Sequence, residues 1–503
     1  MKRKMFRKLM AATLATAMVA GLAGCGDNTD DKPTPSDQPS VSDQPGNAGN
    51  DGSGDGEEVS RYPIMKDANG NKYDLGGAEV YVYTWFPEGL VDSPYTDAVN
   101  EYREWAQEEY NFTMTWDDSG SWGSFNDFAD LASGAKDTEG KLRFYMLPAN
   151  QTAVYTAMTS NLMWDLSSLL PAGIFEENRF KQNGISDLYQ INGEVYACSA
   201  QTPEPRTGMW FNATLLEQLT GITADQMYDW QASGEWTWAK FEEICEQIDS
   251  NSDANGDDIK DYYAIAGNIG SFISACVRCN GSSFAYLGSD GKLVYNVDSP
   301  ATMEALEWQN KLRNAPYWYN RPDGTEWDYF FQAFDEEGKF VFLPEQAYLC
   351  NSGQRLNQAE LPNAGEYGWL MFPIGPSAGG KYVNTYEDNI MAIPKCYTED
   401  EAKTIAAAYS IWYADVIPGY IGYNSRLDGY ESGLYHERAL NETMARMMSE
   451  GANIDTAFMV GKNFTNDPDK DMADIWDTSK SVAECEAAYS SVWKSAIDEF
   501  NNK

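Results

Sequence analysis

The chain is poor in histidine and in basic residues. Its 503 residues include one histidine, His436, and 36 lysine and arginine residues stand against 77 aspartate and glutamate residues, for a net charge of −41. A single imidazole argues against hydrolases that need histidine as a base and against His-rich metal sites. The negative charge repels phosphate groups, so neither nucleic acid nor an anionic lipid surface is expected as a direct partner.

Two other signals are missing from the sequence. No glycine-rich phosphate loop appears, which leaves nucleotide binding without support, and no repeat of solenoid length is present. The chain has ample apolar material instead, with 43% hydrophobic and 14% aromatic residues. A chain of 503 residues is too long for one ordinary hydrophobic core, so we expect a globular body of two lobes.

Residues 1–25 have the pattern of an export signal. A basic start, MKRKMFRK, precedes the apolar stretch LMAATLATAMVAG, which is too short to span a membrane stably. The stretch ends in Leu22-Ala23-Gly24-Cys25, which resembles the lipobox of bacterial lipoproteins. That resemblance implies a lipid-modified Cys25 as the mature N-terminus, and two or more acyl chains anchor durably. The alternative is an ordinary secretory signal with a chance cysteine.

Residues 26–60 form a predicted linker. Proline, glycine, serine, aspartate and asparagine dominate this segment, and valine is its only large apolar residue. Such a composition cannot bury enough surface to offset the entropy lost on ordering. We expect a disordered acidic linker that holds the body away from the membrane.

The cysteines do not form an obvious disulfide framework. Of eight cysteines, Cys25 is assigned to lipid, and an odd number remains, which cannot pair completely within one chain. Cys276 and Cys279 are the only close pair, without the strand-and-helix context of a redox motif or the second half of a zinc site. Buried thiols are the main expectation, and a local disulfide is the alternative.

Strands and helices alternate at the start of the body. The strand patterns lie at 78–85, 111–116 and 143–147, with helical spacing at 93–110 and 125–135. This alternation predicts an α/β layer with a mostly parallel sheet. Ligands bind at the carboxyl ends of the strands in such sheets, so Trp85 and Phe86, at the end of the first strand, become ligand candidates.

The middle of the chain, about 206–372, is richer in helical patterns. Thr237 is placed to cap a helix that begins at Trp238, and Ser299-Pro300 opens another helix that reaches Leu312. Both are typical helix starts, so we expect this part to be richer in helices than the start of the body.

A short acidic loop has the spacing of calcium ligands. Asp253, Asn255, Asp257 and Asp261 resemble the oxygen ligands of an EF-hand loop, although Asp258 stands where glycine is preferred and no glutamate closes the loop. The spacing predicts structural calcium, and a solvated turn is the alternative. No other cofactor is expected.

Six segments follow one another in the order found in a known family. They are INGEVYA at 191–197, GMWFNATLL at 208–216, GEWTWAKF at 234–241, FFQAFDEEGKFVF at 330–342, GWLMFPIGP at 368–376 and NIMAIP at 389–394. Together they resemble the family 1 extracellular solute-binding proteins, the relatives of the maltose-binding protein. The chain departs from that pattern at Ala213, where the family has lysine, and at Pro203, which is displaced.

The resemblance implies a two-lobed α/β fold of the periplasmic-binding-protein type, with hinge crossings and a ligand cleft between the lobes. The implied lobes are 76–203 with 374–428, and 204–373 with 429–503. Binding closes the lobes about the hinge, and no chemical turnover follows.

Candidate ligand residues come from the strand ends and from the resemblance. Aromatic rings cover the apolar faces of sugars, and polar side chains bond their hydroxyls. The candidates are Trp85 and Phe86 after the first strand, Trp210 at the first crossing, Trp369 at the return crossing, Tyr348 by its spacing from Lys339, Asp388 and Asn389 before a strand, and Arg426.

These expectations define a function. The chain is expected to be a monomeric, lipid-anchored protein outside the cell membrane or in the periplasm. It would capture a carbohydrate, in particular an oligosaccharide, and deliver it to the permease subunits of an ABC importer without acting as an enzyme. The alternatives are an exported glycan-active enzyme with a carboxylate pair, a protein of the same fold for a non-sugar solute, and an adhesion or sensory module without an importer.

The leader generates the first prediction. Cys25→Ala removes the thiol that would carry lipid, so the body should appear in the medium or the precursor should stay uncleaved. Fractionation with and without detergent measures this. If the variant still needs detergent to leave the membrane, the lipid anchor is not at Cys25.

Overall fold

The computed structural model places most of the body of the chain. The described residues are 60–86, 93–133, 139–148, 152–200, 207–290, 292–326, 328–350, 356, 366–383, 389–420, 434, 436–449, 465 and 470–502. Cys25, Asp388 and Arg426 therefore lie outside the described residues, and the predictions on them stay predictions.

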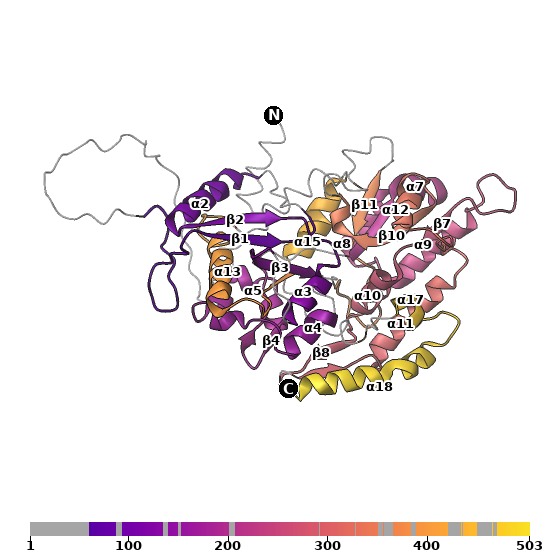
Figure 1. The fold of residues 1–503 in the computed structure, drawn as a ribbon. Helices are drawn as coiled ribbons and strands as arrows, with labels where there is room; N and C mark the ends of the chain where they lie inside the picture. Colours follow the sequence, from indigo (N-terminus) through magenta and orange to yellow (C-terminus); the bar gives the residue numbers. More distant parts are fainter. Residues whose placement is uncertain are drawn as a thin grey trace, which may run out of the picture. The chain divides into compact units, whose positions relative to one another are not determined.

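The first sheet confirms the predicted parallel layer. Its order is β12-β3-β1-β2. The strands are β1 (Ala78–Tyr83), β2 (Phe112–Asp117), β3 (Leu142–Pro148) and β12 (Asn389–Ala392). β1 pairs in parallel with both β2 and β3, whereas β12 joins β3 antiparallel from far along the sequence. Figure 1 shows these strands beside α2 (Thr96–Glu109) and α13 (Glu399–Trp412).

Helix α2 shows how the sequence pattern produces the first core. Its buried residues are Val99, Tyr102, Arg103 and Ala106, which recur at the three- and four-residue spacing of one helix face. Val99, Tyr102 and Ala106 join a first hydrophobic cluster that also contains buried residues of β1 and β3. This first cluster is therefore built by an amphipathic helix lying on a parallel sheet.

The second sheet contains both parallel and antiparallel pairs. Its buried hydrophobic residues belong to a second hydrophobic cluster, which we call the second cluster. Its order is β11-β6-β10-β7. The strands are β6 (Thr207–Asn212), β7 (Tyr263–Ile265), β10 (Phe340–Gln346) and β11 (Tyr367–Leu370). β6 pairs antiparallel with β10 and β11, and β10 pairs in parallel with β7. All six residues of β6 are buried, so this strand is covered on both faces.

Two glycines let β6 and β11 pack closely. A Cβ at Gly368 would come within 2.1 Å of the Phe211 ring, its direct cross-strand partner. A Cβ at Gly208 would come within 2.5 Å of the Trp369 ring. Each glycine therefore makes room for an aromatic ring from the other strand, which explains the glycines in the segments 208–216 and 368–376.

The predicted helix starts in the middle of the chain are confirmed. α9 (Trp238–Ser250) is capped by Thr237, whose side chain accepts a hydrogen bond from the backbone N–H of Lys240. α11 (Pro300–Arg313) is capped by Ser299, with proline in the first turn. Both caps satisfy backbone donors that have no partner within the helix.

The remaining elements complete the body. They are α3 (Ser124–Ala132), α4 (Thr152–Thr159), α5 (Asn178–Lys181), α6 (Ile185–Leu188), β4 (Gln190–Ile191), β5 (Glu194–Val195), α7 (Ala213–Thr220), α8 (Ala224–Ser233), α10 (Ile269–Cys279), β8 (Ala285–Leu287), β9 (Leu293–Tyr295), α12 (Tyr329–Asp335), α15 (Ala445–Ser449), α17 (Met472–Ile475) and α18 (Val482–Asn501), with 3-10 turns at Leu166–Ser168, Ile174–Glu176 and Ala347–Cys350 and a π-helical turn at Ala439–Met444. Within the described ranges no helix is long and apolar enough to cross a membrane.

The cysteines of the described body are reduced. The seven cysteines from Cys198 to Cys485 form no disulfide, and six of them are buried, with Cys396 partly exposed. Burial raises the pKa of the Cys279 thiol to about 12, because the thiolate would lose its hydration. The expectation of buried thiols is confirmed for these six, and the local Cys276–Cys279 disulfide is absent.

Thiol reactivity follows from this burial. In a folded Cys25→Ala protein a water-soluble disulfide reagent should react quickly at Cys396 and slowly at the other six described cysteines, because a buried, protonated thiol is neither accessible nor nucleophilic. All seven should react in denaturant. Absorbance titration of the reagent measures both, with Cys396→Ser as the control. Fast labelling of the Cys396→Ser variant without denaturant would contradict the burial of the other thiols.

Candidate functional site

The carboxyl edge of the first sheet is where the described side chains offer the best ligand surface. β1 and β2 run in parallel and end in register at Tyr83 and Asp117. The loops that follow are tied together, because the N–H of Thr84 donates to the carbonyl of Asp117 and the N–H of Gly120 donates to the carbonyl of Thr84, both at 2.9 Å. The side chains that follow both strands are therefore held at one edge.

Four rings gather at this edge, and we call Trp85, Phe86, Trp116 and Trp122 the aromatic edge. Trp85 meets Phe86 and Trp122 edge to face, with centroids 5.5 Å and 5.4 Å apart. The indole N–H of Trp116 donates to the carbonyl of Phe86 at 2.7 Å. Trp85 and Phe86 are half-buried, but Trp122 is 55% exposed. The aromatic edge thus presents the exposed ring of Trp122 to solvent, and the contacts among the other three rings hold it in place.

Asp117 follows Trp116 at the end of β2, where its carboxylate lies near Arg143 and Lys141. Burial alone would raise its pKa, but hydrogen bonds from the Ser119 hydroxyl and N–H, together with the nearby cations, lower the pKa below its ordinary value. Its second oxygen lies 3.6 Å from Arg143 and 3.7 Å from Lys141. Asp117 is therefore an ionised acceptor at neutral pH.

Asn389 lies on the same edge of the sheet. It opens β12 and pairs with Pro148, the last residue of β3, so it stands at the carboxyl end of that strand. The structure therefore places three of the predicted residues, Trp85, Phe86 and Asn389, at the same edge of the sheet, with β3 between β12 and β1. Their contact with a ligand stays a prediction.

The second sheet holds Tyr348 and a buried acid at the end of β10. Glu345, which is 3% exposed, accepts hydrogen bonds from the Asn268 side chain at 2.6 Å and from the N–H of Gln346 at 2.9 Å. Tyr348 lies in the turn that follows and is half-buried against the second cluster. Asn268 lies between the end of β7 and the start of α10, and Glu345 is near the end of β10. Polar groups from the ends of these two neighbouring strands therefore meet here.

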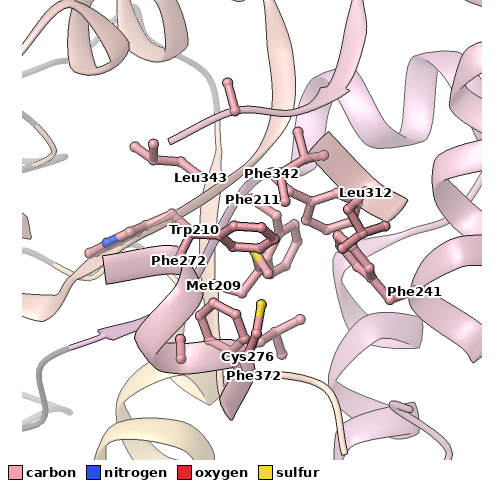
Figure 2. Close-up of a cluster of buried hydrophobic side chains, with 14 of the residues drawn as sticks. Met209, Trp210, Phe211, Phe241, Phe272, Cys276, Leu312, Phe342, Leu343 and Phe372 are labelled. Carbon is pink, nitrogen blue, oxygen red and sulfur yellow. The ribbon is translucent and has the colours of Figure 1, made fainter. Parts of the chain in front are cut away.

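Trp210 and Trp369 are not at a surface. Both rings are fully buried and pack on each other, with centroids 4.6 Å apart. Figure 2 shows Trp210 within the second cluster, pointing away from Phe241 and Leu312 on the other side of the strand. β6 and β11 have both faces covered, so neither ring presents a free face in this structure, and contact of Trp210 and Trp369 with a ligand stays a prediction.

Sequence reasoning missed Trp116, Asp117 and Trp122. The rule that selected Trp85, a side chain after a parallel strand, also applies to the second strand and its Trp116-Asp117 ending. Trp122 follows six residues after Trp116 along the chain, and nothing in its local pattern distinguishes it from a core tryptophan. Only its exposure in the structure identifies it.

The chemistry of the edge is that of binding. Rings, a carboxylate and an amide can hold a ligand that has apolar faces and hydroxyls. The one histidine is elsewhere, because His436 stacks on Tyr228 of α8 with centroids 4.7 Å apart. The aromatic edge therefore has no imidazole to serve as a general base.

Comparison with known proteins identifies the fold. No protein-family model matches the chain, and a search of the curated proteins found no match. Solved structures do match. The cyclic alpha-maltosyl-1,6-maltose binding protein of Arthrobacter globiformis has a TM-score of 0.53 at 12% identity, over 85% of this chain and 100% of that one. The galacto-N-biose-/lacto-N-biose I-binding protein of Bifidobacterium longum has a TM-score of 0.53 at 14% identity, over 85% and 98%.

The chain has the two-lobed fold of the solute-binding proteins. A third match of this fold is UgpB from Mycobacterium tuberculosis in complex with glycerophosphocholine, with a TM-score of 0.50 at 13% identity, over 84% of this chain and 99% of that one. At these identities the likeness establishes the fold. The lobe boundaries expected for this solute-binding-protein fold stay predictions.

The predicted calcium loop, residues 253–261, forms a turn around Asp253. Asp253 accepts hydrogen bonds from the N–H groups of Gly256, Asp257 and Asp258, and Asp258 has a φ of 66°, the conformation for which glycine is preferred. In the described part of the chain, however, no three carboxylate, histidine or cysteine side chains are grouped to hold a metal ion. Calcium at Asp253, Asn255, Asp257 and Asp261 stays a prediction.

Melting curves test the loop. Added calcium should raise the melting temperature, since an ion bound only to the folded state stabilises it, and Asp257→Ala should abolish the rise. Asp323→Ala, at another exposed aspartate, should keep it. A melting curve that calcium and a chelator leave unchanged would make the loop a plain turn.

Proposed function

We propose that the chain is an extracellular solute-binding protein that captures a carbohydrate, in particular an oligosaccharide, for an ABC importer. The observation that carries the proposal is the aromatic edge with its ionised neighbour Asp117, at the carboxyl ends of parallel strands in a solute-binding-protein fold. This is the sheet edge at which α/β proteins hold ligands.

The residue types of the edge support a sugar. A pyranose presents C–H groups on its faces and hydroxyls around its rim, so one ring face and a few fixed acceptors recognise it together. Trp122 offers the most exposed ring, Trp85 supports it from the side, and Asp117 supplies a charged acceptor, whose hydrogen bonds are stronger than neutral ones. Asn389 adds an amide along the same edge.

The topology supports a hinge mechanism. The chain leaves the first sheet at Cys198, which bridges Met391 of β12, and enters the second sheet at Thr207 of β6. It leaves β11 at Leu370 and returns to the first sheet at Asn389. Two crossing segments of this kind act as a hinge in a two-lobed protein, and ligand binding shifts the population toward closure.

The leader places the protein outside the cell. We propose that Cys25 carries the lipid anchor, that residues 26–60 space the body from the membrane, and that the closed monomer docks on permease subunits. The ligand is released unchanged, so the protein is not an enzyme. Incubation with a glycan panel and chromatography of the products tests this, and released fragments would favour the exported enzyme instead.

A non-sugar solute is the second candidate, and one observation favours it. UgpB, which shares the fold, was solved with glycerophosphocholine. An exposed indole ring such as that of Trp122 also suits a quaternary ammonium group, through cation–π attraction. Choline esters therefore belong in the same binding screen as the sugars.

Calorimetric titration tests the aromatic edge. With the ligand selected by a thermal-shift screen, Trp85→Ala and Trp122→Ala should each weaken binding at least about tenfold, since each removes a stacked ring and its buried area. Trp230→Ala is the matched control, a half-buried tryptophan on α8 that should bind like the parent.

The outcomes separate the proposals. If both edge variants bind the ligand with the affinity of the parent protein, the ligand site is not at the aromatic edge. If a choline ester binds and no sugar does, the solute is not a carbohydrate, but the proposal of a solute-binding protein is unaffected.

A further inference from the structure

The C-terminal helix belongs to both hydrophobic clusters. α18 has twenty residues without interruption and is therefore ~30 Å long. Its buried residues Val482, Cys485 and Trp493 join the second cluster, around β6 and β10. Its buried Ile497 joins the first cluster, around β1 and β3, and Phe500 packs against that cluster too. One rigid rod thus reaches from the core of one sheet to the core of the other.

The β8–β9 hairpin also has residues in both hydrophobic clusters. It lies in the sequence between α10 and α11, whose buried apolar residues belong to the second cluster. Yet Ala285 and Leu293, which are 0% and 3% exposed, belong to the first cluster. Tyr295 packs against both clusters. The hairpin therefore extends from the second core into the first.

The hairpin and the helix are fastened to each other. The side-chain oxygen of Asn501 accepts the N–H of Leu293 and its amide donates to the carbonyl of Leu293, each at 2.8 Å, as a neighbouring strand would. Further along, the Tyr295 hydroxyl donates to Glu486 at 2.9 Å, and the Lys494 ammonium lies 4.4 Å from the centroid of the Tyr295 ring. Figure 1 shows the end of α18 next to β8.

We propose that the hairpin and residues 497–501 of α18 form a clasp that couples the two sheets and restrains their relative motion. The clasp is fixed to the second core by the rest of α18 and contacts the first core through Ala285, Leu293 and Ile497. Separating the sheets at this place exposes these apolar side chains to water, so the packed clasp favours one arrangement of the lobes. Its use in hinge closure rests on the proposed function, whereas the coupling itself does not.

Two variants break the clasp in different ways. Ile497→Ala removes the buried side chain from the first cluster. Asn501→Ala removes only the pair of hydrogen bonds to Leu293, at the last residue of the helix, so it preserves folding even where Ile497→Ala does not. Val492→Ala is the matched control, because Val492 is on the same helix and 65% exposed.

Distances between spin labels measure the coupling without any ligand. The labels replace exposed residues, Glu104→Cys on α2 of the first cluster and Glu246→Cys on α9 of the second. The background is Cys25→Ala with Cys396→Ser, whose other thiols are buried. We expect one narrow distance distribution in the parent and in Val492→Ala. Both clasp variants should lose this single narrow distribution and become broad.

Hydrogen exchange at the Leu293 amide provides the second reading. Asn501→Ala should accelerate it, which verifies that the contact is broken. The clasp is overturned if this amide exchanges faster while the label distances of both variants stay as narrow as in Val492→Ala. Because no ligand is present, this result is independent of whether a carbohydrate binds, and a failed sugar titration leaves the clasp test unaffected.

Discussion

The antiparallel pairing of β6 with β11 joins the two places where the chain changes sheets. β6 follows the first crossing and β11 precedes the return, and their close contact requires Gly208 beneath the Trp369 ring and Gly368 beneath the Phe211 ring. A side chain at either glycine would have to displace an aromatic ring in a close-packed interior. The outgoing and returning segments therefore keep one register, on which the whole second sheet depends.

A similar contact exists on the side of the first sheet. Cys198 and Met391 exchange backbone hydrogen bonds of 3.1 Å and 2.7 Å just before the chain leaves that sheet and just after it returns. The two crossing segments are thus paired at both ends.

The first sheet explains why ligand groups gather at one edge. Parallel strands end on the same side, so the residues after β1 and β2 and the start of antiparallel β12 come together although they are far apart in sequence. Burial does not account for Trp122, whose ring is more than half exposed beside three other rings. The exposed Trp122 ring is the reason why the proposed ligand site is placed at this edge.

Local patterns in the sequence predicted part of the secondary structure. The alternation of strands and helices from residue 78 predicted β1, β2, β3 and their parallel pairing, and single polar residues, Thr237 and Ser299, predicted two helix starts, because periodicity and capping depend on near neighbours. The order of six motif segments predicted the fold that the structural comparisons show. The arguments against nucleic-acid binding and against histidine-dependent hydrolases came from composition alone.

Burial was decided by the tertiary structure. Trp85 and Trp210 both stand at strand positions that the sequence treats alike, yet Trp85 leaves its strand into a loop at the sheet edge while Trp210 stays in a strand covered on both faces. The same holds for Trp122 and for Ile497, which the helical pattern of α18 cannot assign to one core or the other. A local pattern says that a side chain is apolar, whereas its exposure and its neighbours depend on elements hundreds of residues away.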